Sequence, residues 1–322
     1  QWRTTTIAEG GIADREPMIY VGANDGMLHA FSAVAGVEGG VEQWAYIPSL
    51  VFPYLHELTN PNYVHRYFVD GTPKTFDVYY VPPGNSPNDK EWRSVVVGTL
   101  GGGGAGLFAV DATYPDEFNA SNILWEYSGL TDTDFGVSLG QPSVVAMADG
   151  EFRVIVGNGY NTTRNKPILY ILDVATGDVV ETIEAPAATD QGPNGLSTPV
   201  VVDVNGDRVA DTVYAGDLLG NLWKFDVSAK QSNQWEVVGD EPLFTAVGPN
   251  GEQQPITARP TIAGHPRGGV MVFFGTGQYF VEGDEVVPVN LLDRDVYSFY
   301  AVLDVRNEVV TRGELVQQTI LT

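Results

Sequence analysis

Oxygen-bearing side chains alternate along residues 203–211, which read DVNGDRVAD. The alternating positions of this stretch are Asp203, Asn205, Asp207, Val209 and Asp211. In a tight loop, this spacing directs alternate side chains toward one centre. Calcium takes six to eight oxygen ligands at about 2.3–2.6 Å, so the stretch predicts a calcium site in which Val209 contributes its backbone carbonyl. The alternative is a solvated polar turn, which Asp, Asn and Gly also favour.

The stretch differs from the helix-flanked EF-hand loop at two positions. The bidentate glutamate expected at position 12 is Tyr214, and the glycine expected at position 6 is Arg208. The flanking sequences STPVV and TVYAG are typical of strands. We therefore predict a calcium loop carried on a β-hairpin. Three carboxylates and one amide favour calcium over magnesium, which retains more of its water.

The composition excludes several classes of function. The 322 residues include 17 Lys and Arg against 41 Asp and Glu, a formal net charge of -24. Such a surface repels phosphate backbones, so we expect no nucleic-acid partner. The chain has no cysteine, which excludes disulfides and thiolate chemistry. No stretch approaches the roughly 20 apolar residues of a membrane helix, and the start at Gln1 suggests a mature or excised part of an exported protein.

Five similar segments repeat along the chain. Each has an apolar run that ends in glycine, then a turn and a second apolar run. The glycines are Gly22, Gly98, Gly157, Gly216 and Gly275. The last three intervals are each 59 residues, whereas the first is 76 and contains enough strand-like material to hide a degenerate unit. A fixed interval of this kind predicts repeated structural units.

The repeated runs predict an all-β fold. They are short, rich in Val, Ile, Tyr and Phe, and separated by Gly, Asn, Asp and Pro, as in hairpins. Helical periodicity is weak and confined to residues 49–58. We therefore predict one domain over residues 1–322, a β-propeller of antiparallel blades, because a two-sheet sandwich predicts no fixed repeat. Gly101–Gly104 lacks the Lys-Ser/Thr of a P-loop, so we interpret it as a mobile hairpin tip.

Catalytic patterns are missing from the sequence. The four histidines lack metal-ligand spacing, and no G-x-S-x-G nucleophile motif is present. We therefore expect no catalytic residues and no enzymatic activity.

Four stretches together resemble the C-terminal domain of the PilY/PilC family of type IV pilus tip-associated adhesins and biogenesis factors. They are VGANDGMLHAF, FGVSLGQPSVV, DVNGDRVADTVYAGDLLGNLWKFDV and FFGTGQYF, and the resemblance runs from about residue 18 to 305. The calcium loop joined directly to YAGDLLGNLWKFD is its most specific part. Hairpins such as DGMLHAF are less specific, since quinoprotein propellers share them.

The resemblance implies a modified, quinoprotein-like β-propeller that lacks the family's N-terminal region. It implies a protein exported to the surface of a Gram-negative bacterium, at the pilus tip or outer membrane. Calcium held by the five alternating positions of residues 203–211 would then oppose pilus retraction and support pilus biogenesis, twitching motility and adhesion. The implied partners are minor pilins at the pilus tip and a host or abiotic surface receptor.

Two other functions compete with this one. A quinoprotein dehydrogenase shares the DGxLxAF-type hairpin, but the sequence shows neither a catalytic aspartate with its ligand set nor adjacent cysteines. A calcium-dependent adhesion propeller would carry a calcium loop in each blade, whereas one such loop is visible here.

Overall fold

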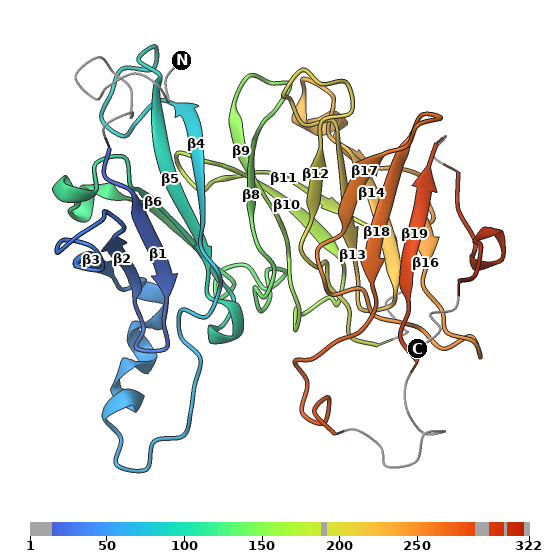
Figure 1. Ribbon diagram of the computed structural model, residues 1–322, viewed down its shortest axis with the longest axis horizontal. Coiled ribbons are helices and arrows are strands. Elements are labelled where there is room, and N and C mark those ends of the chain that lie inside the picture. The colour runs from blue at the N-terminus through green and yellow to red at the C-terminus, as the bar shows by residue number, and fades with distance from the viewer. Residues whose placement is uncertain (1–14, 188–191, 287–295, 306–307, 319–322) are drawn as a thin grey trace.

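The computed structural model describes residues 15–187, 192–286, 296–305 and 308–318. Its strands form five antiparallel sheets, and Figure 1 shows the first sheet at one end of the molecule and the fifth at the other. The first sheet contains β1 (Met18–Gly22), β2 (Leu28–Ser32) and β3 (Glu42–Tyr46). The second contains β4 (Lys74–Tyr80), β5 (Glu91–Thr99), β6 (Gly106–Asp111) and β7 (Ile123–Ser128).

The remaining sheets follow the same order along the chain. The third contains β8 (Ser143–Ala146), β9 (Phe152–Gly157), β10 (Ile168–Asp173) and β11 (Val179–Glu184). The fourth contains β12 (Val200–Val202), β13 (Thr212–Gly216), β14 (Asn221–Asp226), β15 (Glu236–Val237) and β16 (Phe244–Thr245). The fifth contains β17 (Thr261–Gly264), β18 (Val270–Gly275) and β19 (Phe299–Asp304).

The described residues also form 3₁₀ helices, most of them in the connections between strands. They are η3 (Ser49–Thr59), η4 (Gly101–Gly103), η5 (Pro115–Glu117), η6 (Ala120–Asn122), η7 (Ser232–Gln234) and η9 (Arg312–Glu314). The weak helical pattern of residues 49–58 thus corresponds to η3, which contains Pro53. A proline removes a backbone donor and disfavours a regular α-helix.

The glycine repeat marks equivalent strands, as the sequence predicts. Gly22, Gly157, Gly216 and Gly275 end β1, β9, β13 and β18, and Gly98 is the next-to-last residue of β5. The longer first interval contains no additional sheet, although the structure describes it completely. Its extra length forms η3 and the connection to β4, so the suggested degenerate unit is wrong.

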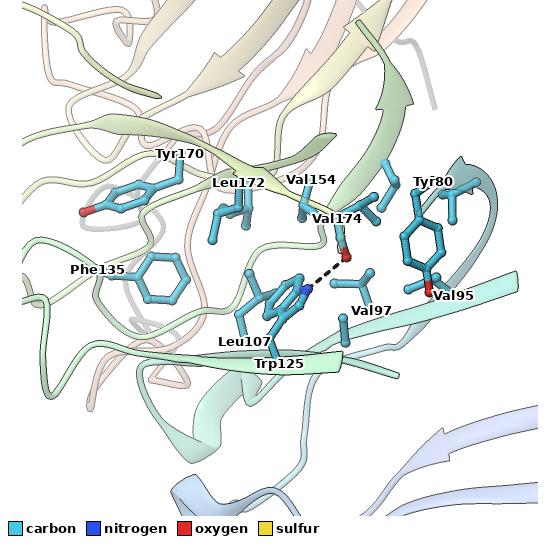
Figure 2. Close-up of a cluster of buried hydrophobic side chains, with 14 of the residues drawn as sticks. Tyr80, Val95, Val97, Leu107, Trp125, Phe135, Val154, Tyr170, Leu172 and Val174 are labelled. Carbon is cyan, nitrogen blue, oxygen red and sulfur yellow. Dashed lines mark hydrogen bonds between the residues drawn. The ribbon is translucent and has the colours of Figure 1, made fainter. Parts of the chain in front are cut away.

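Successive sheets pack face to face through apolar side chains, which explains why strands such as β10 are buried along nearly their whole length. Figure 2 shows the layer between the second and third sheets, where Leu107 and Trp125 face Tyr170 and Leu172. The indole Nε1 of Trp125 also donates a hydrogen bond to the backbone oxygen of Val174 at 2.9 Å. The confirmed architecture is therefore an array of β-sheets stacked as propeller blades.

The Gly101–Gly104 run connects β5 to β6, as expected of a hairpin, but it does not project freely. A Cβ placed on Gly103 would lie 1.8 Å from the backbone oxygen of Phe68. The N–H of Gly102 donates to Asp70 Oδ2 at 3.1 Å. The glycines permit close backbone packing, so the prediction of a mobile tip is wrong for this segment.

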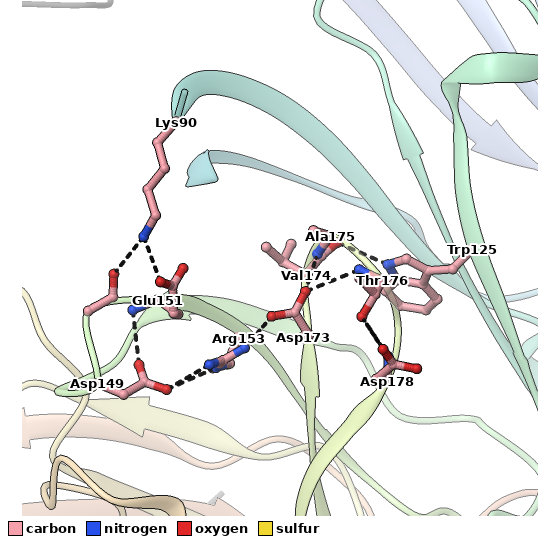
Figure 3. A network of polar contacts seen from close by, with 11 residues as sticks. Lys90, Trp125, Asp149, Glu151, Arg153, Asp173, Val174, Ala175, Thr176 and Asp178 are labelled. Atoms are coloured by element: carbon pink, nitrogen blue, oxygen red, sulfur yellow. Dashed lines mark hydrogen bonds and ion pairs between the residues drawn. The ribbon is translucent and has the colours of Figure 1, made fainter. Parts of the chain in front are cut away.

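Charged side chains add contacts between sheets at the surface. Figure 3 shows Lys90, in the β4–β5 connection, with its Nζ 2.7 Å from Glu151 Oε1. On the third sheet Arg153 contacts both Asp149 and Asp173. A surface pair such as Lys90–Glu151, which links two sheets, contributes at most about 1 kcal/mol, so the apolar layers dominate the packing between sheets.

Candidate calcium site

Residues 203–211 form the connection between β12 and β13, which are antiparallel neighbours. The register pairs Val202 with Thr212, and the N–H of Asp211 donates to the backbone oxygen of Val202 at 3.0 Å. The two ends of the loop are therefore held together by the sheet. The predicted hairpin setting is confirmed, including the strand at Thr212–Gly216.

Asp203 organises the first half of the loop. Its Oδ1 accepts hydrogen bonds from the N–H groups of Gly206 at 2.6 Å and Asp207 at 3.2 Å. Its Oδ2 accepts from the N–H of Arg208 at 2.7 Å. The Asp203 carboxylate thus holds residues 203–208 in a tight turn.

The backbone of Arg208 has a φ of 72°, in the left-handed region that favours glycine. This is position 6 of the calcium loop, where an EF-hand has glycine. The loop therefore keeps the backbone conformation of that position although the residue differs. The sequence departs from the EF-hand pattern at this position. In the structure the residue type differs, but the left-handed backbone conformation is kept.

The other three polar side chains of the loop also accept hydrogen bonds from backbone N–H groups. Asn205 Oδ1 accepts from the N–H of Asp207, and Asp207 Oδ1 accepts from the N–H of Val209, each at 2.8 Å. Asp211 Oδ2 accepts from the N–H groups of Val204 at 2.8 Å and Asn205 at 3.3 Å. Asn205 and Asp207 thus bond the backbone two residues ahead, as in Asx turns, whereas Asp211 joins the end of the loop to its beginning.

The electrostatics of Asp203 favour its charged form. Desolvation acts to raise the pKa of its carboxyl, but the backbone N–H groups of Arg208, Gly206 and Asp207 outweigh it and lower the pKa below its usual value. A carboxylate is the form that binds a hard cation, so this residue is ready to act as a ligand.

The donor atoms fit calcium in chemical type, since all five proposed ligands offer oxygen. Within the described residues, however, His, Asp and Glu side chains form no group of three that could hold a metal ion. In this structure the three loop carboxylates accept backbone N–H groups instead of facing a common centre. Calcium coordination therefore requires these side chains to turn inward, and the site stays a prediction.

The loop is attached to the sheets on both sides. The N–H of Ala210 donates to the backbone oxygen of Ala146, at the end of β8 in the third sheet, at 2.9 Å. Three residues beyond the loop, the Tyr214 hydroxyl donates to Asp304 Oδ2, in β19 of the fifth sheet, at 2.5 Å. Burial raises the pKa of Tyr214, as does this carboxylate, so the phenol remains a donor. The hairpin is thus connected to both neighbouring sheets.

Sequence reasoning missed Asp217, which directly follows β13. Its side chain is fully buried and accepts five hydrogen bonds. The donors are the N–H groups of Leu219 and Asn221 and the side chains of Asn194, Asn221 and Trp223. Burial raises the pKa of Asp217 above its usual value, and the hydrogen bonds from Asn221, Trp223 and Asn194 offset only part of that rise. Since every neighbour donates, the environment suits a carboxylate that holds the turn.

The comparisons with known proteins agree on one family. The model of the PilY1 beta-propeller domain matches residues 3–322. A type IV pilus biogenesis factor PilY1 homolog of Xylella fastidiosa is 39% identical over 317 residues, covering 94% of this chain and 20% of the relative. The type IV pilus biogenesis factor PilY1 of Pseudomonas aeruginosa strain UCBPP-PA14 is 40% identical over 296 residues, covering 84% of this chain and 24% of the relative.

A solved structure supports the same assignment. The crystal structure of the Pseudomonas aeruginosa PilY1 C-terminal domain matches with a TM-score of 0.78 and 35% identity, covering 96% of this chain and 63% of that one. The chain spans about a quarter or less of the curated relatives named above. The five-sheet array and its sequence therefore place this chain in the PilY1 β-propeller family.

Proposed function

We propose that this chain belongs to a protein required for type IV pilus biogenesis, and that calcium bound by residues 203–211 regulates it. The observation that carries the first part is family membership: relatives named as pilus biogenesis factors are 39% and 40% identical to this chain. Those relatives are named for assembly and not for catalysis. No helix in the described residues is long and apolar enough to cross a membrane.

The calcium part of the proposal rests on the loop itself. Three carboxylates, one amide and the Val209 carbonyl lie on nine consecutive residues whose ends the β12–β13 pair holds together. Repulsion among the carboxylates opposes their convergence, and a bound cation removes that repulsion. The ligand set lacks the bidentate glutamate of high-affinity loops, so we expect affinity nearer to extracellular modules, with a dissociation constant of about 10⁻⁴–10⁻³ M.

The regulatory effect follows from the way in which the hairpin is attached. Ordering of residues 203–211 acts on Ala210, which is bonded to the third sheet, and on β13, which is bonded to the fifth. A ligand shifts an equilibrium only by its different affinity for the two states. We propose that the calcium-bound arrangement binds a pilus partner better than the calcium-free one and thereby opposes retraction.

The location and partners are part of the same proposal. The protein acts outside the cell, at the pilus tip or outer membrane of a Gram-negative bacterium. Its direct partners are minor pilins, and adhesion to a host or abiotic receptor and twitching motility depend on the pili that it supports.

The test combines binding with piliation. Calorimetric titration of calcium into the metal-stripped chain should show one site that Asp203→Ala abolishes. Val204→Ala is the matched control, because the Val204 side chain is exposed and donates no oxygen ligand. Reintroduced into a deletion strain, the control should restore surface pili and twitching, whereas Asp203→Ala should not. Normal calcium binding and piliation by Asp203→Ala would disprove the regulatory role, and normal piliation in the deletion strain would disprove the pilus role.

A further inference from the structure

The connection between β3 and β4 projects from the first sheet (Figure 1, lower left). We call residues 49–67, which comprise η3 and the extended segment after it, the arm. The arm is the reason why the first glycine interval is 76 residues and not 59. An insertion into an otherwise regular repeat lies on a surface and is a common place for binding residues.

The arm is held in one shape by its own contacts. The guanidinium of Arg66 lies 3.7 Å from the centre of the Tyr54 ring, a cation–π contact, and 3.1 Å from Glu57 Oε1. Arg66 thereby fastens the extended segment to η3. At the base of the arm, Val51 is buried against the first sheet. A segment ordered before binding loses less conformational entropy when it binds.

The arm exposes large apolar side chains. Phe52 is 57% exposed, Val64 is 81% exposed and Tyr67 is 48% exposed. Tyr63 is also exposed, and the rings of His65 and Tyr67 have their centres 4.8 Å apart. Aromatic residues and arginine are enriched in the cores of protein interfaces, so the composition of the arm is that of a binding surface.

The charge of the arm indicates the chemistry of its partner. The whole chain has a net charge of -24, yet at pH 7, with His56 and His65 neutral, the arm carries one negative charge, on Glu57, and one positive charge, on Arg66. These two form an ion pair with each other. The partner surface therefore needs no positive charge, and the contact is expected to be insensitive to salt.

The ring geometry favours a protein over a stacked ligand. The rings of Tyr63 and His65 lie at 83° to each other, and those of His65 and Tyr67 at 82°. Perpendicular rings do not form the flat platforms on which successive nucleic-acid bases stack. Exposed aromatic rings of this kind are common in protein interfaces.

We propose that the arm is a docking site for a protein partner with an uncharged, apolar surface. The inference rests on the proposed function, in which this partner is a subunit of the type IV pilus. The arm lies between the first and second sheets in the chain and the candidate calcium loop in the fourth sheet, so the arm provides a contact separate from the metal.

The probe is pili sheared from a strain of the source bacterium that lacks this protein and is also disabled in pilus retraction, so that pili remain; these pili are immobilised for surface plasmon resonance. The Phe52→Ser/Val64→Ser double variant should bind these pili at least about tenfold more weakly. Arg66→Ala should also weaken binding, because it releases the extended segment, which carries Val64, from η3 without removing either apolar side chain. Tyr79→Ser is the matched control, since Tyr79 is 41% exposed on β4 and lies outside the arm. Binding of the unaltered chain should change little between low and high salt.

Three outcomes would overturn the proposal. If the double variant binds as well as the control, the arm is not the docking site, although the pilus function stands. If the unaltered chain does not bind pili at all, the pilus function and the arm proposal fail together. If sedimentation shows that the double variant abolishes self-association of this chain and leaves pilus binding unchanged, the occupant is a second copy.

Discussion

The buried carboxylate of Asp217 gives the most stringent test of how the β13–β14 hairpin is held. Replacement by asparagine preserves its size and removes its charge. Two backbone N–H groups, of Leu219 and Asn221, face Oδ1 at 3.0 and 2.8 Å. The side chains of Asn194, Asn221 and Trp223 donate to Oδ2 at 2.9–3.1 Å. An asparagine must turn its NH₂ group toward one of these two sets of donors.

The less costly orientation keeps the asparagine oxygen on the three side-chain donors. The N–H groups of Leu219 and Asn221 then face another donor and lose their acceptor. An unsatisfied buried donor costs about 1–3 kcal/mol, and removal of a desolvated charge offsets part of the loss. We therefore expect Asp217→Asn to lower the free energy of unfolding by about 3 kcal/mol. With an unfolding entropy of about 2 cal/mol/K per residue, the melting temperature falls by about 4 °C.

Differential scanning calorimetry measures this difference, with Asp226→Asn as the control. Asp226 lies on the same hairpin, but it is exposed, and its Oδ1 accepts hydrogen bonds from the N–H and the hydroxyl of Ser228. The control should change the free energy of unfolding by less than about 1 kcal/mol. If Asp217→Asn melts at or above the temperature of the unaltered protein, burial of the charge outweighs the five hydrogen bonds and the reasoning is refuted.

Three further substitutions test other parts of the structure. Gly98→Ala places a Cβ 2.4 Å from Cζ of Phe108. The overpacking should lower the free energy of unfolding, measured in urea, by about 1–3 kcal/mol; an unchanged midpoint would show that the ring moves freely. Trp125→Phe leaves the buried oxygen of Val174 without its donor and should cost about 1–3 kcal/mol in the same assay; a neutral result would contradict that role. Arg208→Gly relieves a left-handed φ and removes a positive charge, so calorimetry should show tighter calcium binding, by about fivefold; weaker binding would count against the proposed site.

The repeat could be predicted because it is local in the sequence. A buried strand needs a continuous apolar run, and the glycine at its end permits close approach of the neighbouring sheet. At Gly157, a Cβ would lie 2.3 Å from the backbone oxygen of Ser197. The setting of the loop at residues 203–211 was predictable for the same reason, since its flanking strands lie within a few residues of it.

Contacts between distant residues could not be predicted in this way. The Gly101–Gly104 run looked like a free tip because Phe68, which excludes any side chain at Gly103, comes from a segment more than thirty residues earlier. Asp217 was missed because one of its partners, Asn194, is twenty-three positions away in the sequence. Composition shows that a polar group is present, but it does not show whether tertiary partners bury it.

The strand β13 lies between Asp211, which the sequence predicts as a calcium ligand, and Asp217, which sequence reasoning missed. Asp211 precedes β13, Asp217 follows it, and all five residues between them are buried. Val213 and Ala215 pack in the apolar layer that includes the third sheet, whereas Tyr214 packs toward the fifth and bonds to Asp304. Close-packed interiors transmit displacement instead of absorbing it. A cation that draws Asp211 inward therefore acts on two sheet interfaces through one buried strand.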